Sequence, residues 1–263
     1  MAMDLAILLP SLRNDGCNYT AILAEVLSEK QDAQTAGDEI RANSLWAIQT
    51  VVDVHEQFVQ MYEKLAAGKY YEAWCDAEQI EIALSNLARN SQEAYAVVHD
   101  LNRIIHQLQS LYPYRIFASY VMQIKKEKCS ICGLDRSIRH YCGHRVGYVY
   151  NGEFCCNIVT EADFKGVDIV TNPVNKYSVL FPSDAEGQHD HYDYTLVAGL
   201  MKYWKSPFQS WQYEVKIIYK SASDFPGLSD EDYCPCGSAR LYGECCKGNT
   251  EGIKHRVYTF IVE

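Results

Sequence analysis

No stretch of the 263-residue sequence approaches the roughly 20 consecutive apolar residues that a membrane-spanning helix needs. The start of the chain also lacks the basic residues and the longer apolar run of a secretory signal peptide. From these absences we expect no membrane span and a cytoplasmic location. Clustered cysteines in that compartment are typical of metal binding rather than of disulfides.

Familiar catalytic signatures are absent as well. The sequence has no Gly-x-x-x-x-Gly-Lys-Ser/Thr phosphate loop, no Gly-x-Gly-x-x-Gly turn, no His-Glu-x-x-His helix and no Gly-x-Ser-x-Gly elbow. The His-x-Glu and Pro-Cys-x-x-Cys pair of the zinc deaminases is missing too. The sequence therefore favours a non-enzymatic role, without deciding the question.

Positive charge is scarce and unevenly placed. The 24 Lys and Arg residues face 34 Asp and Glu residues, and the net charge of −10 disfavours bulk binding to nucleic acid or anionic membranes. Residues 1–115 carry 16 acidic and 8 basic residues, whereas residues 125–145 carry six basic and two acidic ones. We expect these cations to offset an anionic cysteine-rich site and the acidic first half. A phosphate or nucleic-acid contact is the alternative.

Hydrophobic spacing predicts two structural classes in one chain. Between residues 18 and 111 apolar residues recur at i, i+3, i+4 and i+7, which predicts three or four antiparallel helices in a bundle domain, 1–120. Shorter alternating runs in 121–263 predict a β-rich domain that bears the metal sites, with a short helix over 195–204. The fold class expected is α+β. The predicted strands cover 148–155 (a hairpin around Asn-Gly), 167–171, 177–181, 213–219 and 256–262.

The eleven cysteines are clustered, nine of them between Cys129 and Cys246. Two close pairs near the C-terminus, separated by a short loop, can wrap one tetrahedral zinc ion. Pro235 stiffens the first pair and Gly237 lets the backbone turn around the metal. The predicted ligands of this site are Cys234, Cys236, Cys245 and Cys246.

The Cys234-Pro-Cys-Gly-Ser238 core and the closing Cys245-Cys246 pair resemble the SEC-C motif. This motif is the zinc knuckle at the C-terminus of the preprotein-translocase motor ATPase and on many unrelated bacterial proteins. The resemblance implies a metal site and a docking role over 230–250, but no activity. In the translocase the motif is a terminal appendage, whereas predicted strands flank it here. We therefore expect the knuckle to be an excursion between two paired strands.

A second cluster has the spacing Cys-x2-Cys-x9-Cys-x-His, which suits a zinc ribbon or knuckle. Its predicted ligands are Cys129, Cys132, Cys142 and His144. The fourth ligand stays open, because His140, Cys155 and Cys156 rival His144.

The run from Cys142 through the Asn-Gly turn to Val167-Asp-Ile-Val looks like a cysteine-rich module of tailed-phage prohead-protease-related proteins. Such proteases would place a nucleophilic serine where this chain has Asp168, so the resemblance does not imply proteolysis.

One polar segment is the best catalytic candidate outside the cysteines. His189, His191 and Asp193 can hold a metal ion, which leaves a metal-dependent hydrolase or nuclease of a bacterial defence system as an alternative. The leading hypothesis is a zinc-binding adaptor with two structural zinc ions per chain and a protein partner. A nucleic-acid-binding zinc finger over 125–145 is a further alternative, and the oligomeric state stays open.

Overall fold

A computed structural model of the chain describes residues 5–181, 191–238 and 240–262. It divides into two compact units, each described separately below. The larger unit runs to Lys202 and takes in Ser206–Phe208, while the smaller holds Tyr203–Lys205 and the chain from Gln209 onward. The expected α+β class is confirmed, because helices fill the first part of the chain and antiparallel strands dominate the rest. The boundary predicted near residue 120 falls inside the larger unit, within its first strand (Phe117–Cys129).

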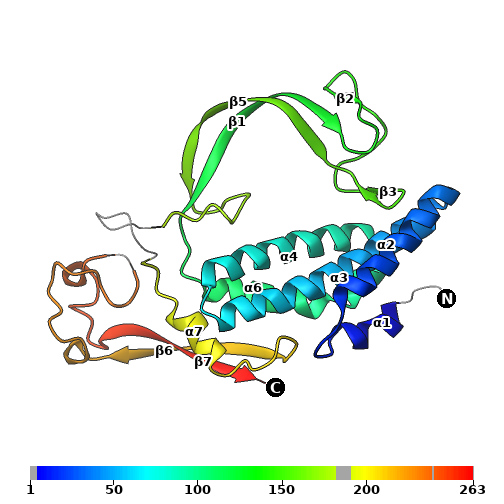
Figure 1. Cartoon of the computed structure of the whole chain (residues 1–263). Coiled ribbons are helices and arrows are strands. Elements are labelled where there is room, and N and C mark those ends of the chain that lie inside the picture. The colour runs from blue at the N-terminus through cyan, green and yellow to red at the C-terminus, as the bar shows by residue number, and fades with distance from the viewer. Residues whose placement is uncertain (1–4, 182–190, 239, 263) are drawn as a thin grey trace. The chain divides into compact units, whose positions relative to one another are not determined.

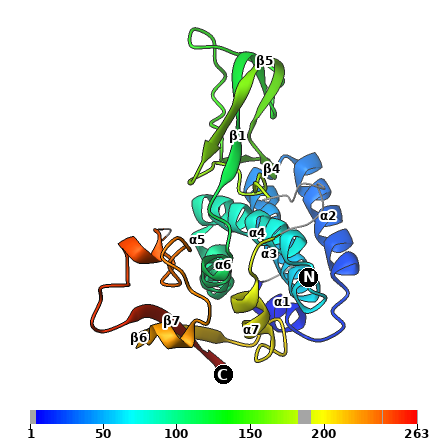
Figure 2. The same ribbon diagram turned by 90° about the vertical axis from the view of Figure 1, so that its left-hand side faces the viewer.

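Residues 5–111 form a helical bundle, in which Figures 1 and 2 show α2, α3 and α4 side by side. Local signals set the helix ends. Asn18 and Asp38 accept backbone N–H bonds as N-caps, and Gly37 ends α2 in the left-handed region at φ 72°. The helices are α1 (Leu5–Leu12), α2 (Tyr19–Ala36), α3 (Glu39–Ala66), α4 (Tyr70–Asn90), α5 (Gln92–Ala96) and α6 (His99–Leu111).

The core of the bundle follows the apolar stripes of α3, α4 and α6. Val52 and Phe58 of α3, Leu84 of α4 and Leu101 and Leu108 of α6 are fully buried. Burial of such side chains contributes about 1.5–3 kcal/mol each, so packing between stripes stabilises the helices more than local propensity does. The apolar spacing continues in the sequence from Ala94 to Leu108, but the structure divides this segment between two helices, since α5 ends at Ala96 and α6 begins at His99.

A long two-stranded ribbon follows the bundle. Strand β1 (Phe117–Cys129) pairs antiparallel with β5 (Asn157–Val170), and Figure 1 shows the two strands curving together as an arch. Near the far end of the arch β1 also pairs with β2 (Asp135–Arg136). The predicted Asn-Gly hairpin is present as β3 (Val149–Tyr150) and β4 (Glu153–Phe154). Only 167–171 of this ribbon was predicted as a strand.

The near end of the ribbon is fixed to the bundle by aromatic residues. Trp74 lies with its ring centroid 5.0 Å from those of Tyr112 and Tyr114, and its indole N–H donates to the Lys176 carbonyl at 2.7 Å. Phe117 is buried beside them. From its aromatic residues, the sequence predicts that all of 112–121 is buried between the helices and the metal-binding domain. That expectation is wrong for Ile116 and Tyr120, which are exposed.

The far end of the ribbon returns to the bundle at the β3–β4 turn. Lys30 is buried, and its ammonium donates to the Gly152 carbonyl at 3.2 Å. The Gly152 N–H donates to Asn43 Oδ1 at 2.7 Å. Gly152 has a φ of 75° and lies so close to α3 that an added Cβ would meet the Ala42 carbonyl at 3.0 Å. Glycine is therefore required both by the turn and by the close approach.

The rest of the larger unit is short. Helix α7 (Thr195–Met201) occupies most of the predicted 195–204 segment. The strand predicted over 177–181 is wrong, since only an isolated bridge between Phe117 and Val179 forms there. Its apolar residues instead pack against the aromatic group at the near end of the ribbon, where Phe181 contacts Tyr71 and Tyr114.

The smaller unit is a β-hairpin with a long excursion. Strand β6 (Trp211–Lys220) pairs antiparallel with β7 (Ile253–Val262), from Trp211 opposite Val262 to Lys220 opposite Ile253. The knuckle lies between these two strands, as the sequence predicted. Its small core consists of Cys234, Tyr242 and Ile253.

A buried histidine gives the bundle a pH dependence. His55 has no exposed surface, and its Nδ1–H donates to the Val51 carbonyl at 2.7 Å. Burial lowers the pKa of His55 to about 4, although the Val51 bond opposes the shift. In an unfolded chain histidine titrates near ~6.5, so the unfolded state takes up the proton first. The free energy of unfolding should thus fall by about 3 kcal/mol as the pH drops from ~6.5 to ~4.

We predict that His55→Leu removes this part of the acid destabilisation. Urea unfolding at pH 7.5 and pH 5, followed by helical circular dichroism, should show a smaller pH-dependent loss in the variant than in the wild type. His106→Leu changes an exposed histidine of α6 and serves as the control. An equal loss in the wild type and His55→Leu would contradict the assignment.

Candidate metal centres

The structure gathers the four C-terminal cysteines of the knuckle. The sulfur atoms of Cys234, Cys236, Cys245 and Cys246 all lie within 4.8 Å of one another. Cys236 Sγ is 3.5 Å from Cys245 Sγ, which is 3.8 Å from Cys246 Sγ. A turn after the first cysteine creates this spacing, since the Gly237 N–H donates to the Cys234 carbonyl and Gly237 has a φ of 75°.

Polar groups around the knuckle favour thiolates. The hydroxyl of Ser238 lies 3.1 Å from Cys245 Sγ, and the Arg240 guanidinium donates to the same sulfur at 3.6 Å. The Ser238 hydrogen bond is the main reason that the pKa of Cys245 falls to about 6. Burial raises the pKa of Cys246 to about 12. Four sulfur atoms gathered this closely are a donor set that fits a divalent thiophilic metal.

The first cysteine cluster lies where β1 ends. The donor atoms of Cys129, Cys132, Cys142 and His144 also lie within 4.8 Å of one another, and Cys129 Sγ is 3.7 Å from His144 Nδ1. The Gly133 N–H closes a turn on the Cys129 carbonyl at 2.9 Å, with Gly133 at φ 71°. This turn brings Cys132 back beside Cys129 and builds a three-sulfur, one-nitrogen set.

The three residues that rival His144 as the fourth ligand, Cys155, Cys156 and His140, lie in different surroundings. Cys155 is buried with its sulfur 4.0 Å from Cys129 Sγ, so it lies against the cluster as a fourth thiol. Cys156 is exposed, and its N–H donates to the Ser130 hydroxyl. His140 is also exposed, in a turn closed by backbone bonds with Ser137. Neither of these two exposed residues belongs to the gathered set.

Arg136, one of the cations of 125–145 expected to offset a cysteine-rich site, is a member of this centre. Its Nη2 donates to Cys129 Sγ at 3.2 Å, to Cys155 Sγ at 3.3 Å and to the His144 carbonyl at 2.8 Å. Burial opposes ionisation of Cys129, but the Cys132 N–H and the Arg136 guanidinium lower the pKa of Cys129 to about 5. Both centres therefore have an arginine that donates to sulfur, Arg136 in one and Arg240 in the other. In the sequence each arginine stands between two successive ligands of its centre, and this position is the signal that could have indicated its role.

Most of the other basic residues of 125–145 are paired locally. Lys125 lies 2.7 Å from Asp163, Lys126 lies 2.7 Å from Glu161, and Lys128 lies 3.9 Å from Asp135. With Arg136, which contacts the cysteine cluster, four of the six basic residues of 125–145 therefore have a local partner. Arg136 thus lies in the cysteine-rich site as expected, whereas the three lysines pair with carboxylates of the strands rather than with the acidic first half of the chain.

The remaining histidines do not form a centre within the described part of the chain. His189 lies outside the described residues. Asp193 is exposed, and one of its carboxylate oxygens accepts the Thr195 N–H at 2.9 Å. His191 and Asp193 belong to neither gathered set, and no third set occurs among the described residues.

Comparison with protein-family models, with curated proteins and with solved structures gives no significant match. Among the described residues no helix is both long enough and apolar enough to cross a bilayer. Two cysteine-rich centres able to hold metal ions are thus the functional feature that the structure supplies.

We predict that His144→Ala weakens metal binding at the first centre, because it removes the one nitrogen donor near Cys129. His140→Ala is the matched control and should leave binding unchanged. Cobalt titration can measure this, since the visible absorption of cobalt reports tetrahedral sulfur and nitrogen ligation. If His144→Ala binds cobalt as the wild type does and Cys155→Ser does not, Cys155 is the fourth ligand and the assignment is wrong.

Proposed function

We propose that this chain is an adaptor with two structural zinc ions, which docks a protein partner through its C-terminal knuckle. The observation that carries the proposal is the closed donor set of each centre. Zinc prefers four sulfur or nitrogen ligands in a tetrahedron, and a catalytic site would keep one position for water. Four protein ligands leave no such position, so both ions serve the fold.

The knuckle supports a docking role in two ways. Its sequence resembles the SEC-C motif, a module found on proteins with unrelated activities. Its surface also offers Tyr233, which is 76% exposed beside the buried Cys234. Exposed tyrosines are typical of interfaces, because the ring packs while the hydroxyl stays solvated. The knuckle that carries this surface is anchored at both of its ends by the paired strands β6 and β7.

The two alternatives have less support. A hydrolase would need His189, His191 and Asp193 to converge, and only the last two lie in the described chain, outside any gathered set. A nucleic-acid finger would need the cations of 125–145, of which Lys125, Lys126 and Lys128 are paired with carboxylates. We therefore retain the adaptor as the proposed function.

The proposal predicts that Cys236→Ser loses one of two zinc ions per chain, because three thiolates no longer close the tetrahedron. Elemental analysis of the purified protein measures the stoichiometry. Cys17→Ser changes a cysteine far from both centres in the sequence and should keep both ions. Unchanged zinc content in Cys236→Ser would overturn the metal assignment.

Docking can be tested separately from zinc binding. Tyr233→Ser should keep both zinc ions yet lose the proteins that co-purify with the tagged wild-type chain. Cys17→Ser should keep those proteins. If Tyr233→Ser and Cys236→Ser both retain the same co-purifying proteins as the wild type, the knuckle is not the docking surface.

A further inference from the structure

The larger unit contains a pocket where the loop between α1 and α2 meets α3. The pocket has a volume of about 410 Å³. Its wall is built by side chains from residues 14–19, from residues 56–63 of α3 and from Pro207–Phe208. All three segments belong to the larger unit, so the pocket lies wholly within that unit.

The charged residues of this pocket are all acidic. Asp15, Glu56 and Glu63 line it, and no lysine, arginine or histidine does. Within the described residues none of these three carboxylates forms an ion pair. Burial is the main reason that the pKa values of Cys17 and Tyr19 are raised, and the nearby charge of Glu56 raises both further. The pocket therefore carries negative charge that no side chain of the described chain offsets.

Two tyrosine rings line the pocket beside these carboxylates. Tyr19 and Tyr62 are both half-buried, and the Tyr19 hydroxyl donates to the Leu12 carbonyl, which fixes the position of its ring. The face of an aromatic ring attracts an ammonium group as a carboxylate does, and both attractions strengthen where water is partly excluded. Aromatic rings beside unpaired carboxylates are thus the chemistry of a site for an organic cation.

A buried hydrogen-bond acceptor lies behind one wall of the pocket. Phe208 lines the pocket, and its ring centroid is 5.6 Å from that of the fully buried His55. Because Nδ1–H of His55 donates to Val51, its Nε2 is an acceptor, and it has no hydrogen-bond partner among the described residues. Arg13 also contacts Phe208, but it does not line the pocket and it is paired with Asp100 at 3.0 Å. The region thus has an acceptor without a donor as well as carboxylates without a cation.

The positions of the carboxylates on α3 define the length of a ligand. Glu56 and Glu63 are seven residues apart, so they lie on one face of the helix about 10 Å from each other along its axis. Val59 and Gln60 lie on the same face between them and also line the pocket. A linear ligand with a positive group near each end could therefore reach both carboxylates, while its apolar middle covers Val59.

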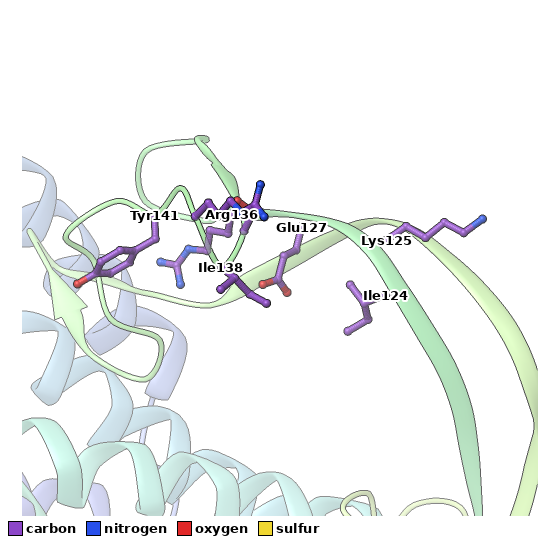
Figure 3. Close-up of a pocket in the computed structure, with 8 residues that line it drawn as sticks. Ile124, Lys125, Glu127, Arg136, Ile138 and Tyr141 are labelled. Atoms are coloured by element: carbon purple, nitrogen blue, oxygen red, sulfur yellow. The ribbon is translucent and has the colours of Figure 1, made fainter.

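The larger hollow beside β1 lacks this imbalance of charge. It has a volume of about 770 Å³, and Figure 3 shows Lys125 and Arg136 among the residues that line it. Lys125 pairs with Asp163, and Arg136 donates to the sulfur of Cys129. The charges of these two residues already have partners, so they select no ligand there.

We propose that the pocket between the α1–α2 loop and α3 binds a linear organic polycation, with ammonium groups about 10 Å apart on an apolar chain. Free oligoamines such as spermidine have this chemistry, and so do two lysine side chains of an extended peptide. The excess of eight negative charges in residues 1–115 raises the local concentration of such cations.

Isothermal titration calorimetry of the full, zinc-loaded chain with spermidine tests the proposal, in a buffer of low ionic strength because salt screens such ion pairs. We expect saturable binding. Glu56→Gln keeps the shape of a half-buried side chain but removes its charge, and it should weaken binding about tenfold. Asp32→Asn removes an exposed carboxylate of α2 that does not line the pocket, and it should bind spermidine as the wild type does. Circular dichroism checks that both variants fold.

Two diamines of equal charge test the spacing. Diaminooctane, with an amine at each end, can reach both Glu56 and Glu63, whereas the shorter diaminopropane cannot. The longer diamine should bind about tenfold more tightly, because its second contact is intramolecular.

A blocked Lys-Ala-Ala-Lys peptide distinguishes the two sources of ammonium groups. Tighter binding than spermidine assigns them to lysines of a protein, and weaker binding assigns them to a free oligoamine. Equal affinity of the wild type and Glu56→Gln, equal affinity of the two diamines, or no binding of any of these ligands would overturn the proposal.

Discussion

Two sets of four sulfur or nitrogen donors, each within 4.8 Å, impose the main physical constraint on this chain. Thiolates at this separation repel, and neutral thiols in a half-buried site make weak hydrogen bonds. A bound divalent cation would neutralise this repulsion. The free energy of metal binding would then contribute to the free energy of folding. The knuckle depends on it most, because the buried residues around its cysteines are only Tyr242 and Ile253, with Phe225 and Leu228 partly buried beside them.

The first centre has a different structural task. It ends β1, closes the loop to β2 and lies next to the β3–β4 turn that Lys30 and Asn43 bind. The long ribbon is thereby held at both ends, at the aromatic group around Trp74 and at this cysteine-rich tip. Arg136 lies within the centre and neutralises part of its charge. We infer that metal at this tip orders the far end of the ribbon.

The sequence predicted the features that short patterns encode. Apolar stripes and caps located the bundle, Asn-Gly located the β3–β4 hairpin, and the eight side chains singled out by cysteine spacing are the ones that the structure gathers. It did not predict β1, because a ribbon exposed on both faces shows no burial pattern and Lys125–Lys128 resembles a solvated loop. The contacts of Arg136 with particular sulfur atoms could not be predicted because they depend on loop geometry, and Tyr120 was misplaced because aromatic content suggested burial.

The most direct measurement of the central claim is X-ray absorption at the zinc edge of the purified chain. Two zinc ions bound by seven cysteines and one histidine predict a first shell with sulfur and nitrogen in a ratio of seven to one. The zinc–sulfur distance should be about 2.3 Å, as in tetrahedral structural sites. A shell of sulfur alone would replace His144 by Cys155. A substantial oxygen shell, or fewer than two zinc ions per chain, would contradict two closed structural sites.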